Sequence, residues 1–156
     1  MVKKFYQIEI GDEKHIAKAM AKNVPISLKY SVELAREIKG RPVKKAEDFI
    51  DRVLRHETYL PLRKYNKKVG HRRGKPFSHV KSGRYPTRTL KAFRDLLNSV
   101  KENADYKGLE SENLIISHIF ASQGFRRMSN QPQGRISGKS RKKKSTHIEI
   151  VVREAK

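Results

Sequence analysis

The fold is decided by the stretch NLIISHIFASQGFRRMSNQPQGRISGKSRKKKSTHIEIVVR, residues 113–153. It begins with an apolar run, residues 114–121, and ends with a run in which every second residue is apolar, residues 146–152. The connection, residues 122–145, carries eight Lys or Arg and no Asp or Glu. Because an unpaired charge is costly to bury, this pattern predicts a β-hairpin whose ends lie in a core and whose cationic middle projects.

Length and composition exclude several classes of protein. A chain of 156 residues suits a single domain, residues 1–156. The absence of cysteine excludes disulfides and thiolate metal sites, and it fits a reducing compartment. No apolar run approaches the roughly 20 residues of a membrane span, and residues 1–10 lack the apolar block of a signal peptide.

The net charge of +21 is concentrated in two segments of the chain. Residues 58–94 and residues 113–148 contain no acid, and together they hold 20 of the 37 Lys and Arg. The rest of the chain has 17 cations against all 16 acids, so it is close to neutral. Segregated cations predict a polyanionic partner, most often nucleic acid, with an acidic protein or a membrane surface as alternatives.

Apolar residues recur at helical spacing in three segments, residues 28–39, 42–57 and 87–107. The predicted core faces are Leu28, Val32, Ala35 and Ile38 in the first segment, Val43, Ala46, Phe49, Ile50, Val53 and Leu54 in the second, and Leu90, Phe93, Leu97, Val100 and Ala104 in the third.

The sheet is predicted from the hairpin base and an N-terminal strand. Ile148, Ile150 and Val152 share one face of the second hairpin strand, and residues 1–10 read as a short strand. The pattern of residues 14–23 is compatible with an extended segment and with a short helix. The predicted fold class is α+β, with three helices packed on a small antiparallel sheet and a long protruding β-hairpin.

Residues 59–85 form a second cationic segment, which we call the basic loop. It has no periodicity, and a loop this long in a compact domain is either functional or disordered. Tyr65, Phe77 and Tyr85 lie among its cations. Lys and Arg neutralise phosphates and aromatic rings stack on unpaired bases, so the mixture favours RNA binding over a solvated run of charge.

The hairpin connection is suited to reach away from the body. Each arm of roughly 10–12 residues would extend about 35 Å at ~3.3 Å per residue. We expect it to be floppy alone and to order on nucleic acid. Arg126, Arg127 and Arg135 are favoured for bidentate phosphate contacts over the lysines, because the guanidinium is a planar fork.

Catalytic and metal chemistry find little support. Glu47, Asp48 and Asp51 would suit a metal-dependent nuclease, but they lie on one predicted helix among Lys and Arg, which favours solvated ion pairs. The six histidines show no paired spacing, and there is no cysteine to complete a zinc site. We therefore expect no enzyme activity, no metal and no cofactor.

Several stretches resemble the universal large-subunit ribosomal protein L twenty-two family in its archaeal and eukaryotic form (L seventeen in older eukaryotic naming). They are AKAM, SLKYSVELAREIKG, PLRKYNKKVGHRRG, SGRYPTRTLKAFRDLLNSVKENADYKGL, NLIISHI, and GRI followed by HIEIVV. The resemblance covers residues 17–154, and the KYNKKVG segment points to the archaeal and eukaryotic branch.

The resemblance implies a structural constituent of the cytoplasmic large ribosomal subunit, without catalysis, membrane or dedicated homo-oligomer. It implies a body on the outer face of the subunit and a hairpin that passes through ribosomal RNA to line the nascent-polypeptide exit tunnel. The implied partners are large-subunit ribosomal RNA, neighbouring ribosomal proteins and the nascent polypeptide. The implied roles are assembly of the subunit and shaping of the tunnel.

Two sets of site residues follow from the charge map and the resemblance. The candidate RNA-binding residues are Lys18, Lys22, Lys29, Arg63, Lys64, Tyr65, Asn66, Lys67, Lys68, His71, Arg72, Arg73, Lys75, Lys81, Arg84, Tyr85, Arg126, Arg127, Arg135, Lys139, Arg141, Lys142, Lys143 and Lys144. The candidate tunnel-facing tip is Met128, Ser129, Asn130, Gln131, Pro132 and Gln133.

The sequence departs from the family pattern in the same region. Residues 128–133 have no cation where relatives usually carry more arginine, and residues 134–147 are about two residues longer and lysine-rich. An uncharged tip is compatible with facing a moving peptide. The alternative function is an architectural DNA-binding protein with β-ribbon arms, for which Pro132 near the tip is suggestive. An RNA-processing enzyme is a third class.

Overall fold

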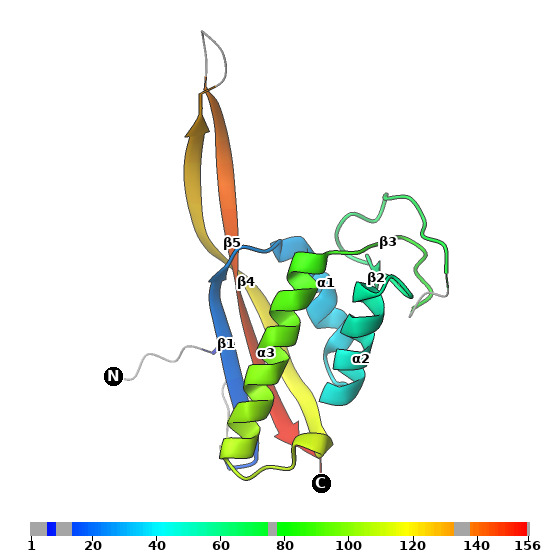
Figure 1. Cartoon of the computed structure of the whole chain (residues 1–156), viewed down its shortest axis with the longest axis vertical. Helices are drawn as coiled ribbons and strands as arrows, with labels where there is room; N and C mark the ends of the chain where they lie inside the picture. The colour runs from blue at the N-terminus through cyan, green and yellow to red at the C-terminus, as the bar shows by residue number, and fades with distance from the viewer. Residues whose placement is uncertain (1–5, 9–13, 75–77, 133–137, 156) are drawn as a thin grey trace.

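The computed structural model describes residues 6–8, 14–74, 78–132 and 138–155. Figure 1 shows a body of helices and strands from which one long hairpin projects. The elements in chain order are β1 (Ile16–Val24), α1 (Leu28–Ile38), α2 (Val43–Leu54), β2 (Leu60–Pro61), β3 (Gly83–Arg84), α3 (Thr87–Tyr106), the 3-10 turn η1 (Ser111–Asn113), β4 (Leu114–Gln131) and β5 (Lys139–Glu154). The predicted α+β class with a protruding hairpin is confirmed.

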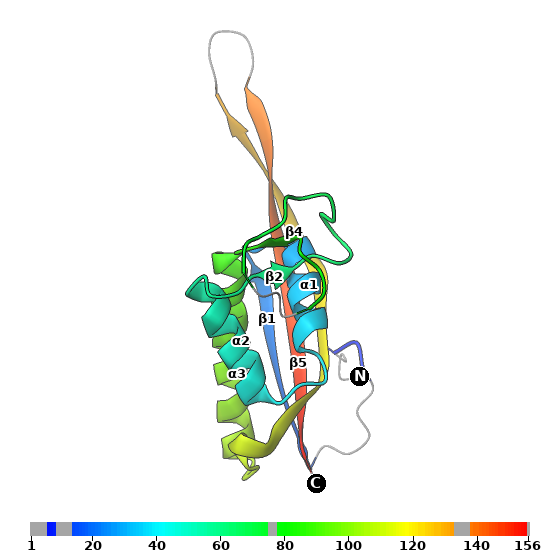
Figure 2. The ribbon, with the colours of Figure 1, turned by 90° about the vertical axis from the view of Figure 1, so that its right-hand side faces the viewer.

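The main sheet has the order β1-β5-β4 and is antiparallel throughout. The helices cover one of its faces, as Figure 2 shows edge-on. The alternating residues Ile148, Ile150 and Val152 of the central strand are fully buried in the core, as predicted. Burying a side chain of this size contributes about 1.5–3 kcal/mol, so β5 is a major source of stability for the body.

The N-terminal strand lies later in the chain than predicted. Within residues 1–10, only Tyr6, Gln7 and Ile8 are described, and they form a bend. The strand that pairs with β5 is β1. It lies in residues 14–24, most of which the sequence left open as either an extended segment or a short helix. Small alanines on its helix-facing side let α3 pack closely, which explains why a weakly apolar stretch forms a core strand.

Two of the three predicted helix faces are confirmed, and the first is wider than predicted. In α1, Leu34, Ala35 and Ile38 are buried in the core, whereas Leu28 and Val32 are only half-buried. Glu33 and Glu37 are also buried, although both carry charge. The reason is that α1 has two covered sides, because the sheet packs on one and the basic loop on the other.

The ends of the basic loop are clamped together. Strands β2 and β3 pair Leu60 with Arg84 and Pro61 with Gly83. Tyr59 is fully buried against this clamp, and its hydroxyl donates to the Val80 carbonyl oxygen at 3.3 Å. A Cβ on Gly83 would lie 2.0 Å from Tyr59 Cδ2, so only glycine fits there. Burial raises the pKa of Tyr59, and nearby Tyr85 raises it further.

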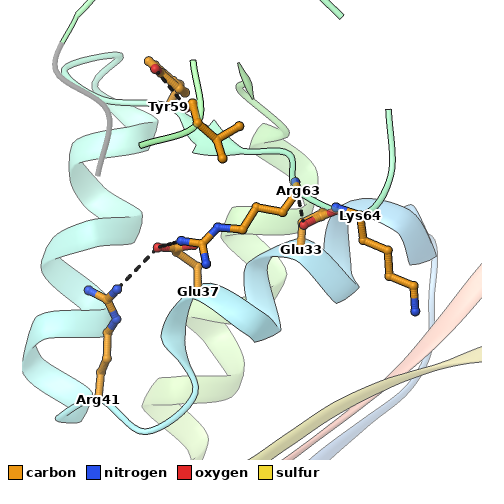
Figure 3. A network of polar contacts seen from close by, with 7 residues as sticks. Glu33, Glu37, Arg41, Tyr59, Arg63 and Lys64 are labelled. Carbon is orange, nitrogen blue, oxygen red and sulfur yellow. Dashed lines mark hydrogen bonds and ion pairs between the residues drawn. The ribbon is translucent and has the colours of Figure 1, made fainter. Parts of the chain in front are cut away.

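The two buried glutamates of α1 hold the start of the loop (Figure 3). The Glu33 carboxylate accepts the backbone N–H groups of Arg63, Lys64 and Tyr65 at 3.1, 2.6 and 2.5 Å. The Glu37 carboxylate pairs with Arg63 at 3.0 Å and with Arg41 at 3.3 Å. Three successive N–H groups around one anion form a nest, which fixes the backbone direction as the loop leaves β2.

The hairpin strands remain paired well beyond the body. Cross-strand pairing runs from Leu114 with Glu154 to Gln131 with Lys139. We call the projecting part, residues 124–131 of β4 and 139–145 of β5, the ribbon. Residues 128–131 of the predicted tip lie in β4. Polar residues in solvent tolerate strand pairing, and the first strand breaker after Gly124 is Pro132. Gln133 lies outside the described residues.

The buried Glu33 generates a first prediction. Glu33→Gln removes the negative charge from the nest and should lower the free energy of unfolding by about 2 kcal/mol, because charge-assisted hydrogen bonds to a buried group are lost. Amide hydrogen exchange at residues 63–65 should accelerate. The control is Glu102→Gln, the same change on an exposed part of α3. Unchanged exchange at residues 63–65 would rule out Glu33 as the anchor of the loop.

A second prediction concerns the independence of the body. Deleting residues 124–141 leaves residues 142–145 as a four-residue connection between Gln123 and Thr146, which are already paired. Such a length closes hairpins well, so the body should still unfold cooperatively, with at most about 2 kcal/mol lost with the hydrogen bonds at the root. Circular dichroism during heating measures this, and a non-cooperative transition would show that the body needs the ribbon.

Candidate nucleic-acid interface

The two acid-free segments, distant in the sequence, come together at one end of the body. Both views show the basic loop at the end of the helical layer where the ribbon leaves the sheet. The ends of the loop are clamped by β2 and β3, and the base of the ribbon is the continuation of β4 and β5. The excess positive charge therefore forms one extended region at this end.

Most candidate side chains of the basic loop are exposed. Tyr65, Arg84 and Tyr85 are half-buried, and Lys75 lies outside the described residues. The exposed members are Arg63, Lys64, Asn66, Lys67, Lys68, His71, Arg72, Arg73 and Lys81. Exposure leaves their charged groups accessible to phosphate, while the backbone beneath them is held by the glutamate nest.

Internal contacts give the loop a defined shape. Asn66 adopts a φ of 57°, and its carbonyl accepts the N–H of Val69 at 3.2 Å in a tight turn. Arg72 N donates to the Lys81 carbonyl at 2.9 Å, and the Arg72 guanidinium carbon lies 5.6 Å from the Tyr85 ring centroid. A polar loop with a fixed turn and a cation on an aromatic ring is a structured surface, not a solvated run of charge.

The structure brings Lys29 of α1 to the basic loop and leaves two other candidates elsewhere. Lys29 Nζ and Lys64 Nζ lie 6.0 and 5.5 Å from the centroid of the Tyr65 ring. Lys18 and Lys22 lie in β1, on the sheet face opposite the helices, where Lys18 Nζ is 5.7 Å from the Tyr6 ring. These two lysines belong to a different surface from the loop.

The ribbon carries cations on both faces. In the register, Arg126 is opposite Lys144 and Arg127 is opposite Lys143. Like charges directly opposite each other destabilise a strand pair, and the ribbon contains no acid to relieve them. An external polyanion would remove this repulsion. The exposed ribbon cations are Arg126, Arg127, Lys139, Arg141, Lys142, Lys143 and Lys144, and Arg135 lies outside the described residues.

The ribbon leaves the body at two adjacent irregularities. The register of β1 shifts between Ala21 and Val24, and that of β4 shifts between Gln123 and Arg126, on either side of β5. Asn23, with a φ of 54°, fills the space between them. Its Oδ1 accepts the N–H of Phe125 at 3.0 Å and lies 3.1 Å from Ser145 Oγ. Paired bulges of this kind bend and twist a strand pair, so this joint sets the direction of the ribbon.

Close packing at this joint requires a glycine. A Cβ on Gly124 would lie 2.6 Å from Ser145 Oγ and 2.8 Å from Asn23 Oδ1. Neither Asn23 nor Phe125 was singled out from the sequence, and the buried Glu33 was missed as well. A glycine inside a strand pattern, which often marks a bulge, was the one available signal.

Two histidines and two of the acids weighed for catalysis have structural partners. His118 Nε2 lies 3.0 Å from the buried Glu149 carboxylate, and His147 accepts the N–H of Asn23, so the two histidines do not face each other. Of the acids weighed for catalysis, Glu47 pairs with Lys101 and Asp51 pairs with Arg94 at 3.4 Å. The described residues contain no cluster of metal-binding side chains, and within them no helix has the length and apolar character to span a membrane.

The chain matches known proteins over nearly its whole length. Residues 19–153 match the family of ribosomal protein L22p/L17e. Large ribosomal subunit protein uL22 of Hyperthermus butylicus is 42% identical over 152 residues, which cover 96% of each chain. The proteins of that name from Methanococcus vannielii and Thermoplasma acidophilum are 38% and 36% identical, over 99% of this chain and 99% and 97% of theirs.

All three relatives are archaeal, in agreement with the branch indicated by the KYNKKVG segment. The described geometry, a helix-covered sheet with a long cationic hairpin, agrees with the fold expected for this family. The chain therefore belongs to the ribosomal protein L22p/L17e family and is a structural, non-enzymatic component of the large ribosomal subunit.

Proposed function

We propose that this chain binds large-subunit ribosomal RNA through the basic loop and the ribbon, and that the far end of the ribbon lines the nascent-polypeptide exit tunnel. By holding two RNA segments to one rigid body, it supports assembly of the subunit. Its site of action is the cytoplasmic large subunit, where neighbouring ribosomal proteins contact the rest of its surface.

The observation that carries this proposal is a ribbon with cations on both faces and no acid. A surface patch with cations on one face suits a protein lying on a nucleic acid. Cations all around a narrow strand pair suit insertion between RNA segments, because phosphates can then approach from every side. Side chains such as Lys142 and Lys143, neighbours in β5 that point to opposite faces, would contact different RNA strands.

The same observation separates RNA binding from architectural DNA binding. A β-ribbon arm in a DNA groove contacts the duplex alone, whereas this chain has a second shaped basic surface at the same end of the body as the arm. The core is also complete within one chain, while arms of that class usually come from dimers. A folded RNA, which presents phosphates in several directions, matches both surfaces together.

The distal part of β4 supports the tunnel role. Met128, Ser129, Asn130 and Gln131 are uncharged, and Met128 is 59% exposed. Across the ribbon, Met128 is paired with Lys142 and Ser129 with Arg141, so only the β4 side of this end is neutral and partly apolar. That side suits contact with a moving peptide, since a fully cationic wall would retain acidic segments.

The proposed RNA contacts predict a steep salt dependence. Replacing Arg126 and Arg127 together by Ala should weaken binding of the full chain to a large-subunit RNA fragment and reduce the slope of log K against log salt by about 1 to 2, because each phosphate contact contributes roughly 0.7–0.9. The charge-matched control is Lys45→Ala with Arg52→Ala on α2, outside both basic segments. Equal losses of slope in the two variants would refute a specific role for the ribbon arginines.

The tunnel role predicts a position-specific crosslink. A photoreactive residue at position 128, in salt-washed large subunits that carry a stalled nascent chain, should crosslink to that peptide. Position 106 on α3, where Tyr106 is 95% exposed, serves as the control and should not crosslink to it. Crosslinks from position 128 to RNA alone would contradict the tunnel assignment and leave RNA binding intact.

A further inference from the structure

Phe125 is an exposed aromatic side chain at the root of the ribbon. It is 64% exposed and is the only aromatic residue in the stretch 122–145. A single exposed ring needs no explanation by itself. What distinguishes Phe125 is its surroundings, and its backbone N–H donates to Asn23 Oδ1 at 3.0 Å, which fixes the backbone that carries the ring.

The ring lies beside a hollow of about 500 Å³ between the ribbon and the β1–α1 connection. The hollow is lined by Phe125, Arg127, Lys143, Lys144, Asn23 and Pro25, with Ser145 at its floor. Arg127 follows Phe125 by two residues and is opposite Lys143, so these three side chains share one face of the ribbon. The Arg127 guanidinium carbon lies 5.9 Å from the centroid of the Phe125 ring.

We propose that this hollow is a binding site for one unpaired RNA nucleotide, whose base stacks on Phe125 and whose phosphate is held by Arg127 and Lys143. The proposal rests on RNA binding by the ribbon and adds a base-stacking site to it. A flat apolar ring next to two cations matches a nucleotide, which combines a π face with a phosphate. An acidic peptide would form ion pairs with Arg127 and Lys143 but would provide no group that stacks on Phe125.

The bulge explains why the site exists at this point of the ribbon. Gly124 brings the strand against Ser145 and Asn23, and the extra residue in β4 turns Phe125 outward beside the body. The β1–α1 connection, with Pro25, forms the second wall of this hollow, and the ribbon forms the first.

The test uses the fact that the chain has no Trp. Phe125→Trp introduces a single fluorophore that a stacked base quenches, and Phe120→Trp is the matched control. Phe120 is also an exposed aromatic of β4, at 43%, but it lies on the sheet face opposite the helices. Each full-length variant is titrated with a single-stranded adenosine oligonucleotide, a duplex RNA of equal length and an oligoglutamate peptide of equal charge.

The expected result is strong quenching of the Phe125→Trp variant by the single strand, weaker quenching by the duplex, and little change with oligoglutamate. Phe125→Leu should weaken binding of the single strand roughly ten-fold without changing the salt slope, because stacking releases no counterions. Equal quenching at positions 120 and 125, quenching by oligoglutamate, or full affinity in Phe125→Leu would overturn the site.

The two proposals fail in different ways. If the wild-type chain binds a large-subunit RNA fragment with a steep salt slope while Phe125→Trp shows no quenching, the stacking site is wrong and RNA binding stands. If the wild-type chain binds neither the fragment nor the single strand, RNA binding itself fails.

Discussion

The structure depends on one long strand pair, that of β4 with β5, whose register shifts between Ile116 and His118 and between Gln123 and Arg126. Its inner half places Ile148, Ile150 and Val152 in the core, and its outer half carries the ribbon into solvent. The backbone hydrogen bonds of a strand pair have the same pattern in the core and in solvent, so one hairpin can be core at one end and a cationic arm at the other. Side-chain chemistry alone changes along its length, at the joint formed by Asn23 and Gly124.

The second constraint is that two of the three buried acids in the described residues hold a cationic segment in place. Glu33 and Glu37 are 2% and 4% exposed, and both contact the start of the basic loop. A buried carboxylate without partners would be strongly destabilising, so the loop backbone and Arg63 are as necessary to the glutamates as the glutamates are to the loop. This mutual requirement gives a polar segment a defined fold without a core of its own.

The sequence predicted the elements that depend on local periodicity and missed those that depend on distant partners. The stripe of α3 from Leu90 to Ala104 follows from helical spacing alone and is buried throughout. The strand β1 carries mainly alanines on its core face, which is a weak sequence signal for a strand. It is a strand because its backbone pairs with β5 at the edge of the sheet. Nothing in the local sequence singles out Glu33, because its partners lie about 30 positions away.

In the candidate site, too, local features were predicted from the sequence and long-range contacts were not. Charge segregation marked the basic loop and the ribbon, since a lack of acids over 36 or 37 residues is visible in the chain itself. The joint escaped prediction because Asn23 and Phe125, 102 residues apart, meet only once the sheet has formed. That residues 128–131 lie in a paired strand was also not visible in the sequence, because neutral polar residues such as Ser129 and Asn130 give no strand signal but pair in a solvated ribbon.

In the proposed function, these two anchors together explain how separate basic segments would act as one binding surface. If the loop and the ribbon moved independently, each would bind RNA with its own ordering cost. Because Glu33 fixes the loop to α1 and Asn23 fixes the ribbon to β1, contact at one surface brings the other close to its target, and the second contact becomes effectively intramolecular. The gain comes from rigidity at the joints and not from additional cations, so the neutral body is as important to RNA binding as the charged segments it carries.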